Sequence, residues 1–79
     1  MFEQVAGVIA DIMHVSRDTI TRDTLLAEDL GVDSFEMFRI ILALQDAFDA
    51  EIRPTEEDRK VRTVGEFCDR LKKKLSESI

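Results

Sequence analysis

The sequence predicts an all-helical fold of three longer helices, one short helix and one long loop between the first two helices. Apolar residues recur with the spacing of a single helix face in three segments, near residues 5–13, 34–50 and 64–75. No stretch alternates apolar and polar residues for long enough to indicate a strand. The only proline, Pro54, favours an extended conformation at Arg53, so the second helix is expected to end before it.

Each of the three segments gathers apolar residues on one side, which predicts that the helices pack around a shared core. The first helix presents Val5, Val8, Ile9, Ile12 and Met13, the second Phe35, Phe38, Ile41, Leu42 and Phe48, and the third Val64, Phe67, Cys68, Leu71 and Leu75. Ile40 and Leu44 widen the apolar face of the second helix.

Capping patterns mark the beginnings of the later helices. A capping box pairs the residue that caps a helix start with an acid or amide three positions on. Three pairs have this form, namely Asp33 with Glu36, Thr55 with Asp58, and Thr63 with Glu66. The middle pair predicts a short helical turn between Pro54 and Val61.

The connection between the first two helices, VSRDTITRDTLLAEDLGV, is roughly twenty residues long, and such long loops are uncommon in small domains unless they have a function. It contains the apolar residues Ile20, Leu25, Leu26 and Leu30. These residues predict an ordered loop that folds onto the core.

Length and composition fit one globular domain over residues 1–79, because the chain is 44% hydrophobic and 35% charged. No apolar run approaches the roughly 20 residues that a membrane-spanning helix needs. The start, MFEQVAGVIADIM, lacks the basic residues of a secretory signal. Cys68 is the only cysteine and cannot form a disulfide within the chain, which favours the cytoplasm. We expect a cytoplasmic monomer.

Charge is divided unevenly along the chain, whose net charge is −6. Residues 23–58 hold eleven acidic residues against Arg39 and Arg53, whereas residues 59–79 hold seven basic residues against three acidic ones. The acidic block repels nucleic acid and anionic membranes and attracts partners with basic surfaces. A well-solvated surface is the simpler explanation of the same charges.

The lysines at positions 72–74 match the negative end of the last helix dipole, and we assign them no function.

The segment EDLGVDSFEMF places Ser34 directly after the capping residue Asp33. As the first helical residue, Ser34 would lie beside free backbone N–H groups and the positive end of the helix dipole, an environment that favours a phosphate. Gly31 allows the chain to turn sharply just before it. Serine is also common at helix starts for its capping chemistry alone. These local patterns leave open whether Ser34 bears a phosphate or only belongs to the helix start.

An enzyme active site is not expected, because a catalytic serine needs a base within hydrogen-bond reach. The only histidine, His14, is expected near the end of the first helix, and no glycine elbow surrounds Ser34. Cys68 sits on an apolar face, which is typical of a core residue rather than of a metal ligand. We therefore expect no metal site either.

The segment EDLGVDSFEMFRIILALQDAFDAEI resembles the Asp-Leu-Gly-x-Asp-Ser-Leu motif and following helix of acyl carrier proteins, and KVRTVGEF resembles the start of that family's last helix. The resemblance implies a four-helix bundle of the acyl carrier type. It also implies that a phosphopantetheinyl transferase attaches 4′-phosphopantetheine, taken from coenzyme A, to Ser34. The chain would then be a carrier of acyl groups and not an enzyme.

The same resemblance implies two surfaces on the second helix. Partner enzymes with a basic surface, such as an acyl or aminoacyl ligase, a synthase or an acyltransferase, would contact Asp33, Phe35, Glu36, Met37, Arg39, Asp46 and Asp49. A groove under the helix would shelter the acyl group between Phe38, Ile41, Leu42, Val61 and Phe67. We expect the aromatic bulk of Phe35 and Phe38 to shorten this groove.

The sequence departs from the family pattern at three positions of the second helix. Phe35 replaces the usual leucine after the serine, Phe38 stands where a smaller aliphatic residue is common, and Arg39 replaces an acid of the fatty-acid type. The pathway therefore stays open between fatty-acid, polyketide-like and lipid-modifying biosynthesis. Asp-Ser-Phe and PTEEDRKV also resemble D-alanyl carrier proteins, which an adenylating ligase loads. An unmodified helical docking domain is the alternative of a different class.

Overall fold

The chain is all-helical in the computed structural model, which describes residues 1–77 without the side chains of residues 57 and 59. Its α-helices are α1 (Phe2–Met13), α2 (Ser34–Phe48) and α3 (Val64–Glu77), and its 3₁₀ turns are η1 (Arg17–Thr19) and η2 (Glu56–Lys60). Within residues 1–77 no strand occurs, and one isolated bridge pairs Leu25 with Thr63. The predicted helical class is confirmed.

The fourth, short helix of the predicted bundle is the 3₁₀ turn η2, so the chain reaches four helices only if this turn is counted. The Thr55–Asp58 capping box is present, with the Thr55 N–H donating to Asp58 Oδ2 at 2.6 Å. Thr55 and Val61 are both extended and bound the turn on either side. A segment this short does not offset the cost of nucleating an α-helix, so it keeps the tighter 3₁₀ form.

Within residues 1–77, two residues other than glycine adopt the left-handed conformation and end α1 and α2. His14, with φ 58°, follows α1 and donates its N–H to the Ala10 carbonyl. Asp49, with φ 50°, follows α2 and donates its N–H to the Gln45 and Asp46 carbonyls. These bonds satisfy carbonyls at the helix ends. As predicted, α2 ends well before Pro54.

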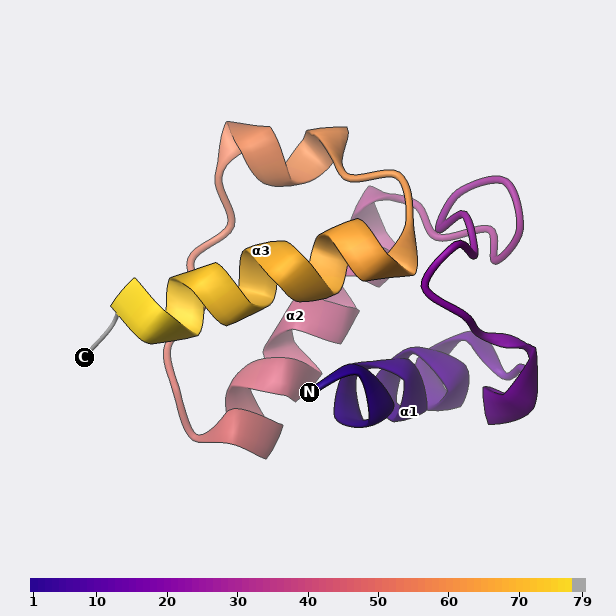
Figure 1. Cartoon of the computed structure of the whole chain (residues 1–79), viewed down its shortest axis with the longest axis horizontal. Helices are drawn as coiled ribbons and strands as arrows, with labels where there is room; N and C mark the ends of the chain where they lie inside the picture. The colour runs from indigo at the N-terminus through magenta and orange to yellow at the C-terminus, as the bar shows by residue number, and fades with distance from the viewer. Residues whose placement is uncertain (78–79) are drawn as a thin grey trace.

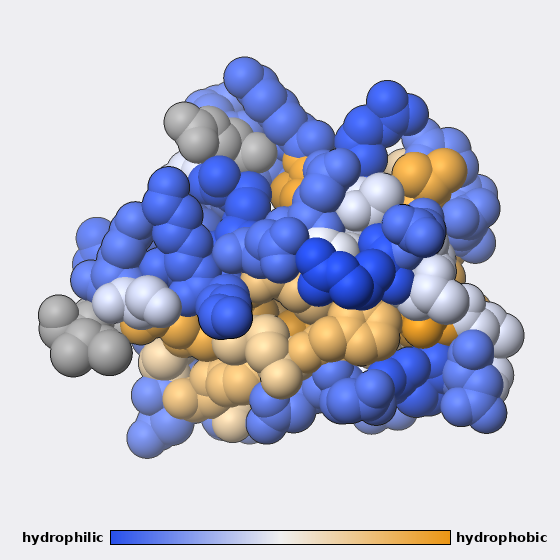
Figure 2. All heavy atoms as spheres, viewed as in Figure 1, coloured by the Kyte–Doolittle hydropathy of each residue, from blue (hydrophilic) through white to orange (hydrophobic). Residues whose placement is uncertain are grey.

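Buried residues of the three α-helices meet in one core, where α1 packs closely against both α2 and α3. Figure 2 shows apolar side chains in a band between α3 and α1, bordered above and below by hydrophilic side chains. The buried hydrophobic residues are Val5, Ala6, Ile9, Ala10, Ile20, Leu26, Val32, Ile40, Ile41, Leu44, Ile52, Val64, Phe67, Cys68 and Leu71. In α2 the buried residues are Ile40, Ile41 and Leu44, whereas Phe35, Phe38 and Leu42 of the expected apolar face are exposed.

The long loop between α1 and α2 is folded onto the core, as expected. Leu26 donates its N–H to the Arg62 carbonyl, and Val64 donates its N–H to the Thr24 carbonyl, each at 2.9 Å. Figure 1 shows this loop meeting the beginning of α3, with η2 at the opposite edge of the molecule from α1. Because the loop is bonded to α3, it holds the start of α2 in a defined place.

Candidate functional site

Ser34 is the first residue of α2 and is exposed. Asp33 caps the helix, because its Oδ1 accepts the Glu36 N–H at 2.8 Å. The Glu36 carboxylate is paired with Arg39, whose Nη1 lies 3.3 Å from Glu36 Oε2. The predicted helix start is therefore confirmed, and the serine hydroxyl lies beside the positive end of the α2 dipole.

Gly31 turns the loop immediately before this start. Its φ is +73°, a left-handed conformation in which other residues are strained, although a Cβ there would meet no atom within 4 Å. The Gly31 N–H donates to the Ala27 carbonyl at 3.0 Å, and the next N–H, of Val32, donates to the Leu26 carbonyl at 2.9 Å. This tight turn directs the chain into Asp33 and Ser34.

A pocket of about 560 Å³ opens beside Ser34 between α2, the long loop and η2. Its walls combine apolar side chains from α2, from the long loop and from the residues that flank η2 with acidic and polar residues. The lining residues are Leu26, Ala27, Glu28, Val32, Asp33, Ser34, Met37, Phe38, Ile41, Pro54, Thr55, Asp58, Val61 and Arg62. The pocket is large enough to receive a flexible organic group attached at the serine.

Three of the five residues expected to form the groove, Phe38, Ile41 and Val61, line this pocket. Leu42 does not line it and is 46% exposed. Phe67 is buried in the core and lines a separate cavity of about 10 Å³. Phe35 is also absent from the lining, so its ring does not narrow the pocket. The sequence pattern missed the contribution of the long loop, whose buried Leu26 and Val32 form part of the wall.

The residues expected to contact partners are spread over the outer side of α2 and its two ends. Asp33, Phe35, Arg39, Asp46 and Asp49 are exposed, while Glu36 and Met37 are half-buried and Met37 lines the pocket. Asp49 lies just beyond the helix, and Asp46 lies within its last turn. Phe35, Phe38 and Leu42, which are 67%, 55% and 46% exposed, form an apolar stripe along this side.

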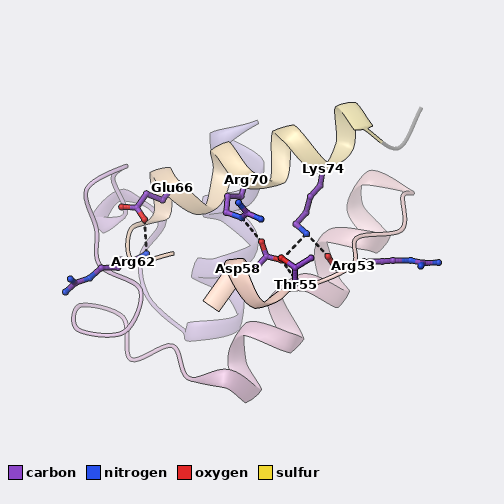
Figure 3. Close-up of polar contacts among 7 residues, drawn as sticks. All are labelled: Arg53, Thr55, Asp58, Arg62, Glu66, Arg70 and Lys74. Carbon is purple, nitrogen blue, oxygen red and sulfur yellow. Dashed lines mark hydrogen bonds and ion pairs between the residues drawn. The ribbon is translucent and has the colours of Figure 1, made fainter. Parts of the chain in front are cut away.

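Asp58 of η2 is the centre of an ion-pair cluster with α3 (Figure 3). Arg70 Nε donates to Asp58 Oδ1 at 2.7 Å, and Lys74 Nζ lies 3.0 Å from Asp58 Oδ2. Lys74 Nζ also donates to the Arg53 carbonyl at 2.6 Å. Burial opposes the charge on Asp58, but the hydrogen bonds from Arg70, the Thr55 N–H and Lys74 outweigh it and lower the pKa of the carboxyl. Lys74, one of the three lysines to which the sequence analysis assigned no function, thus belongs to the ion-pair cluster around Asp58.

Other reactive side chains are not assembled beside Ser34. Cys68 is buried in the core, and this burial raises the pKa of its thiol. His14 lies at the end of α1. The described residues contain no group of three or more histidine, cysteine, aspartate or glutamate residues placed to hold a metal ion.

No helix in the described part of the chain has both the length and the apolar character needed to cross a membrane.

Comparisons with known proteins agree with this geometry. The family model described as "Phosphopantetheine attachment site" matches residues 3–71. The chain is 39% identical over 72 residues to an acyl carrier protein of Lactobacillus acidophilus, covering 91% of this chain and 89% of that protein. A solved structure from Mycobacterium tuberculosis, assigned to the acyl carrier proteins, has a TM-score of 0.71 and 28% identity, with both chains covered completely. The chain therefore belongs to the acyl carrier protein family, whose members bear covalent 4′-phosphopantetheine and act as carriers rather than enzymes.

Proposed function

We propose that Ser34 is the residue that bears 4′-phosphopantetheine and that the chain delivers acyl groups from this position to partner enzymes. The observation that carries the proposal is the position of Ser34, an exposed residue that begins α2 and lines the adjoining pocket. A phosphoester at this place is favoured by the positive end of the α2 dipole. The tight turn at Gly31 directs the chain into Asp33 and Ser34, and Ser34 itself is exposed.

The pocket beside Ser34 fits the group and its cargo. When bound, 4′-phosphopantetheine supplies the thiol that holds an acyl group as a thioester. Met37, Ile41 and Val61 offer apolar surface to an acyl chain that turns inward from Ser34. Phe38 also lines the pocket and is 55% exposed, so it offers apolar surface both to the pocket and to solvent.

The outer side of α2 is proposed as the surface that the transferase and the acyl-loading enzymes contact. Asp33, Asp46 and Asp49 would attract a basic partner, and Phe35 would be the apolar contact nearest the serine. Arg39 places a positive charge among these acids and selects partners that tolerate it. We propose a monomeric cytoplasmic carrier that serves fatty-acid, polyketide-like or lipid-modifying biosynthesis.

Intact mass spectrometry tests the attachment directly. Wild type, Ser34→Ala and the matched control Ser16→Ala, which removes an exposed serine before η1, are incubated with coenzyme A and a broad-specificity phosphopantetheinyl transferase. Wild type and Ser16→Ala are expected to gain the mass of one arm, and Ser34→Ala to gain none.

The opposite result would favour an unmodified docking domain. It consists of no mass gain in wild type while the same transferase modifies a known carrier. Once the arm is attached, loading by ligases offered fatty acids or D-alanine assigns the cargo class and decides the D-alanyl alternative.

A further inference from the structure

Two residues, Ile41 and Asp58, lie between the pocket beside Ser34 and a second, small cavity. Both line the pocket of about 560 Å³, and both also line the cavity of about 10 Å³. Ile41 is 6% exposed, so it is part of the core as well as of the pocket wall. An acyl chain that enters from Ser34 therefore reaches a barrier made of one apolar side chain and one carboxylate.

The carboxylate of Asp58 is held in place by close ion pairs and hydrogen bonds. The Asp58 side chain is 11% exposed, and its partners Arg70 and Lys74 are 30% and 19% exposed. The Asp58 carboxylate accepts a hydrogen bond from Arg70 Nε at 2.7 Å and from the Thr55 N–H at 2.6 Å. Separating such poorly hydrated charges without replacing their partners is strongly unfavourable. A methylene chain offers no replacement partner, so it gains nothing by advancing into the cluster.

The same cluster fastens the wall of the pocket that faces α2. Close helix packing joins α1 with α2 and α3, whereas η2 is not among these closely packed pairs. Figure 3 shows Asp58 reaching from η2 toward α3, with Arg70 and Lys74 extending to meet it. Lys74 Nζ also donates to the Arg53 carbonyl, which ties down the segment that leads into η2. These bonds resist a retreat of the wall from a long chain.

We propose that Asp58, held by Arg70 and Lys74, is the stop that limits how much acyl chain this carrier can shelter. The proposal rests on the proposed function, since it takes the cargo to enter the pocket from Ser34. It replaces the expectation that Phe35 and Phe38 set the length, because Phe35 does not line the pocket and Phe38 lies at its exposed side. Carbons beyond the stop remain in solvent or are left for a partner to bind.

Thermal unfolding of a series of acylated carriers tests the stop. The holo protein is loaded with acetyl, butanoyl, hexanoyl, octanoyl and dodecanoyl groups, and each Tm is compared with that of unacylated holo protein. A fully buried methylene raises the Tm of a domain of this size by about 3–6 °C. We expect the Tm to rise through the first chains of the series and then to reach a plateau. A Tm that continues to rise to dodecanoyl would overturn the proposal.

Two variants separate the stop from a merely stabilising role. Asp58→Ala removes the carboxylate, after which Lys74 can carry its ammonium group to solvent while its apolar stem lines the cavity. The matched control Asp69→Ala removes another ion-paired carboxylate, which contacts Arg22 and does not line either cavity. Each Tm is referred to the unacylated holo form of the same variant. Asp58→Ala is expected to extend the rise to dodecanoyl, and Asp69→Ala to keep the wild-type profile. Identical profiles for all three proteins would refute the stop.

If Asp58→Ala does not fold, Lys74→Met serves the same purpose, because it removes one charge from the cluster and leaves the Asp58–Arg70 pair. The rise of its Tm with acyl-chain length is expected to continue to longer chains than in wild type, but less far than in Asp58→Ala. A dependence of Tm on chain length equal to that of wild type would count against the proposal.

A second series does not depend on the transferase. Ser34→Cys is labelled with methyl, butyl, octyl and dodecyl methanethiosulfonates, to which the buried Cys68 is far less accessible. A Tm that levels off within this series supports the stop even if Ser34 accepts no arm in the mass experiment. A Tm that rises throughout the series overturns the stop while leaving the attachment at Ser34 intact. The two proposals can therefore fail separately.

Discussion

Arg22 and Gly65 are hydrogen-bonded to each other in both directions. The Gly65 N–H donates to the Arg22 carbonyl at 2.9 Å, and Arg22 Nη2 donates to the Gly65 carbonyl at 3.4 Å. A Cβ on residue 65 would lie 2.9 Å from the Arg22 carbonyl oxygen. The long loop can therefore approach the first turn of α3 only because residue 65 has no side chain, and this approach holds the loop that leads to Ser34.

Gly65→Ala is expected to lower the free energy of unfolding by about 1–3 kcal/mol, because the added methyl group must displace backbone atoms. Gly7→Ala is the matched control, since its Cβ would meet nothing within 4 Å inside α1. That change is expected to stabilise the protein by about 0.5–1 kcal/mol through helix propensity. Urea unfolding monitored by circular dichroism measures both. Equal effects of the two substitutions would show that the contact with Arg22 does not constrain the loop.

Asp33→Ala is expected to destabilise the protein by about 0.5–2 kcal/mol, because the Glu36 N–H loses the carboxylate that caps α2. Asp33→Asn retains an oxygen that can accept this bond but removes the charge. Its stability should stay near wild type, while its modification by a basic transferase should slow. Thermal unfolding and the rate of arm transfer, measured on both variants, separate the capping role from the charge. If Asp33→Ala slowed arm transfer but kept the wild-type Tm, the capping role of Asp33 would be contradicted.

Asp58→Asn tests the pH dependence that the ion-pair cluster imposes. The pKa of Asp58 is lowered in the folded protein, despite its burial, by hydrogen bonds from Arg70, the Thr55 N–H and Lys74. The unfolded chain has the ordinary value of about 3.9. The stabilisation is therefore complete above about pH 4 and is lost as the pH falls through the lower pKa of the folded state.

The expected result is a loss of about 1–3 kcal/mol in Asp58→Asn at pH 7, because hydrogen bonds to the charged carboxylate are weakened. The difference from wild type should narrow as the pH is lowered below about 4. Urea unfolding at several pH values between neutral and acid measures this difference. Asp69→Asn, which alters an exposed ion pair with Arg22, should change stability much less than Asp58→Asn does. A difference for Asp58→Asn that is constant at all pH values would contradict its role.

Arg39→Glu is expected to speed loading by a partner enzyme that has a basic docking surface. The substitution replaces the positive charge beside Glu36 with a negative one, and steered association at low salt should rise on the order of tenfold. The advantage should fall as salt screens the charges. Arg53→Glu makes the same change of charge on an exposed residue beyond α2 and serves as the control. Equal loading of wild type and Arg39→Glu at low salt would exclude Arg39 as a selector.

The position of Ser34 could be predicted from the sequence because the signals that define it are local. Asp33 and Glu36 stand three residues apart at a helix start, and Gly31 supplies the left-handed turn before them. Such contacts form within one turn of chain and need no distant partner. The same holds for Pro54, which requires α2 to end before it.

The rotation of α2 could not be predicted in the same way. Apolar residues cover a wide arc of this helix, so its spacing is compatible with more than one buried face. Contact with α1 and the loop buries Ile40 and Leu44 and leaves Phe35 and Leu42 outside. Of the α2 residues expected to form the groove, Phe38 and Ile41 therefore line the pocket and Leu42 does not.

By itself, the sequence determined the order of the helices, their capped beginnings and the Asp-Ser pair that identifies the family. Only the tertiary structure decided which residues enclose the pocket and that Asp58 of η2 meets Arg70 and Lys74 of α3. The physical reason is the range of the interactions. Caps and helix periodicity act between neighbours in the chain, whereas a pocket wall or a shared ion pair exists only once separate segments have packed together.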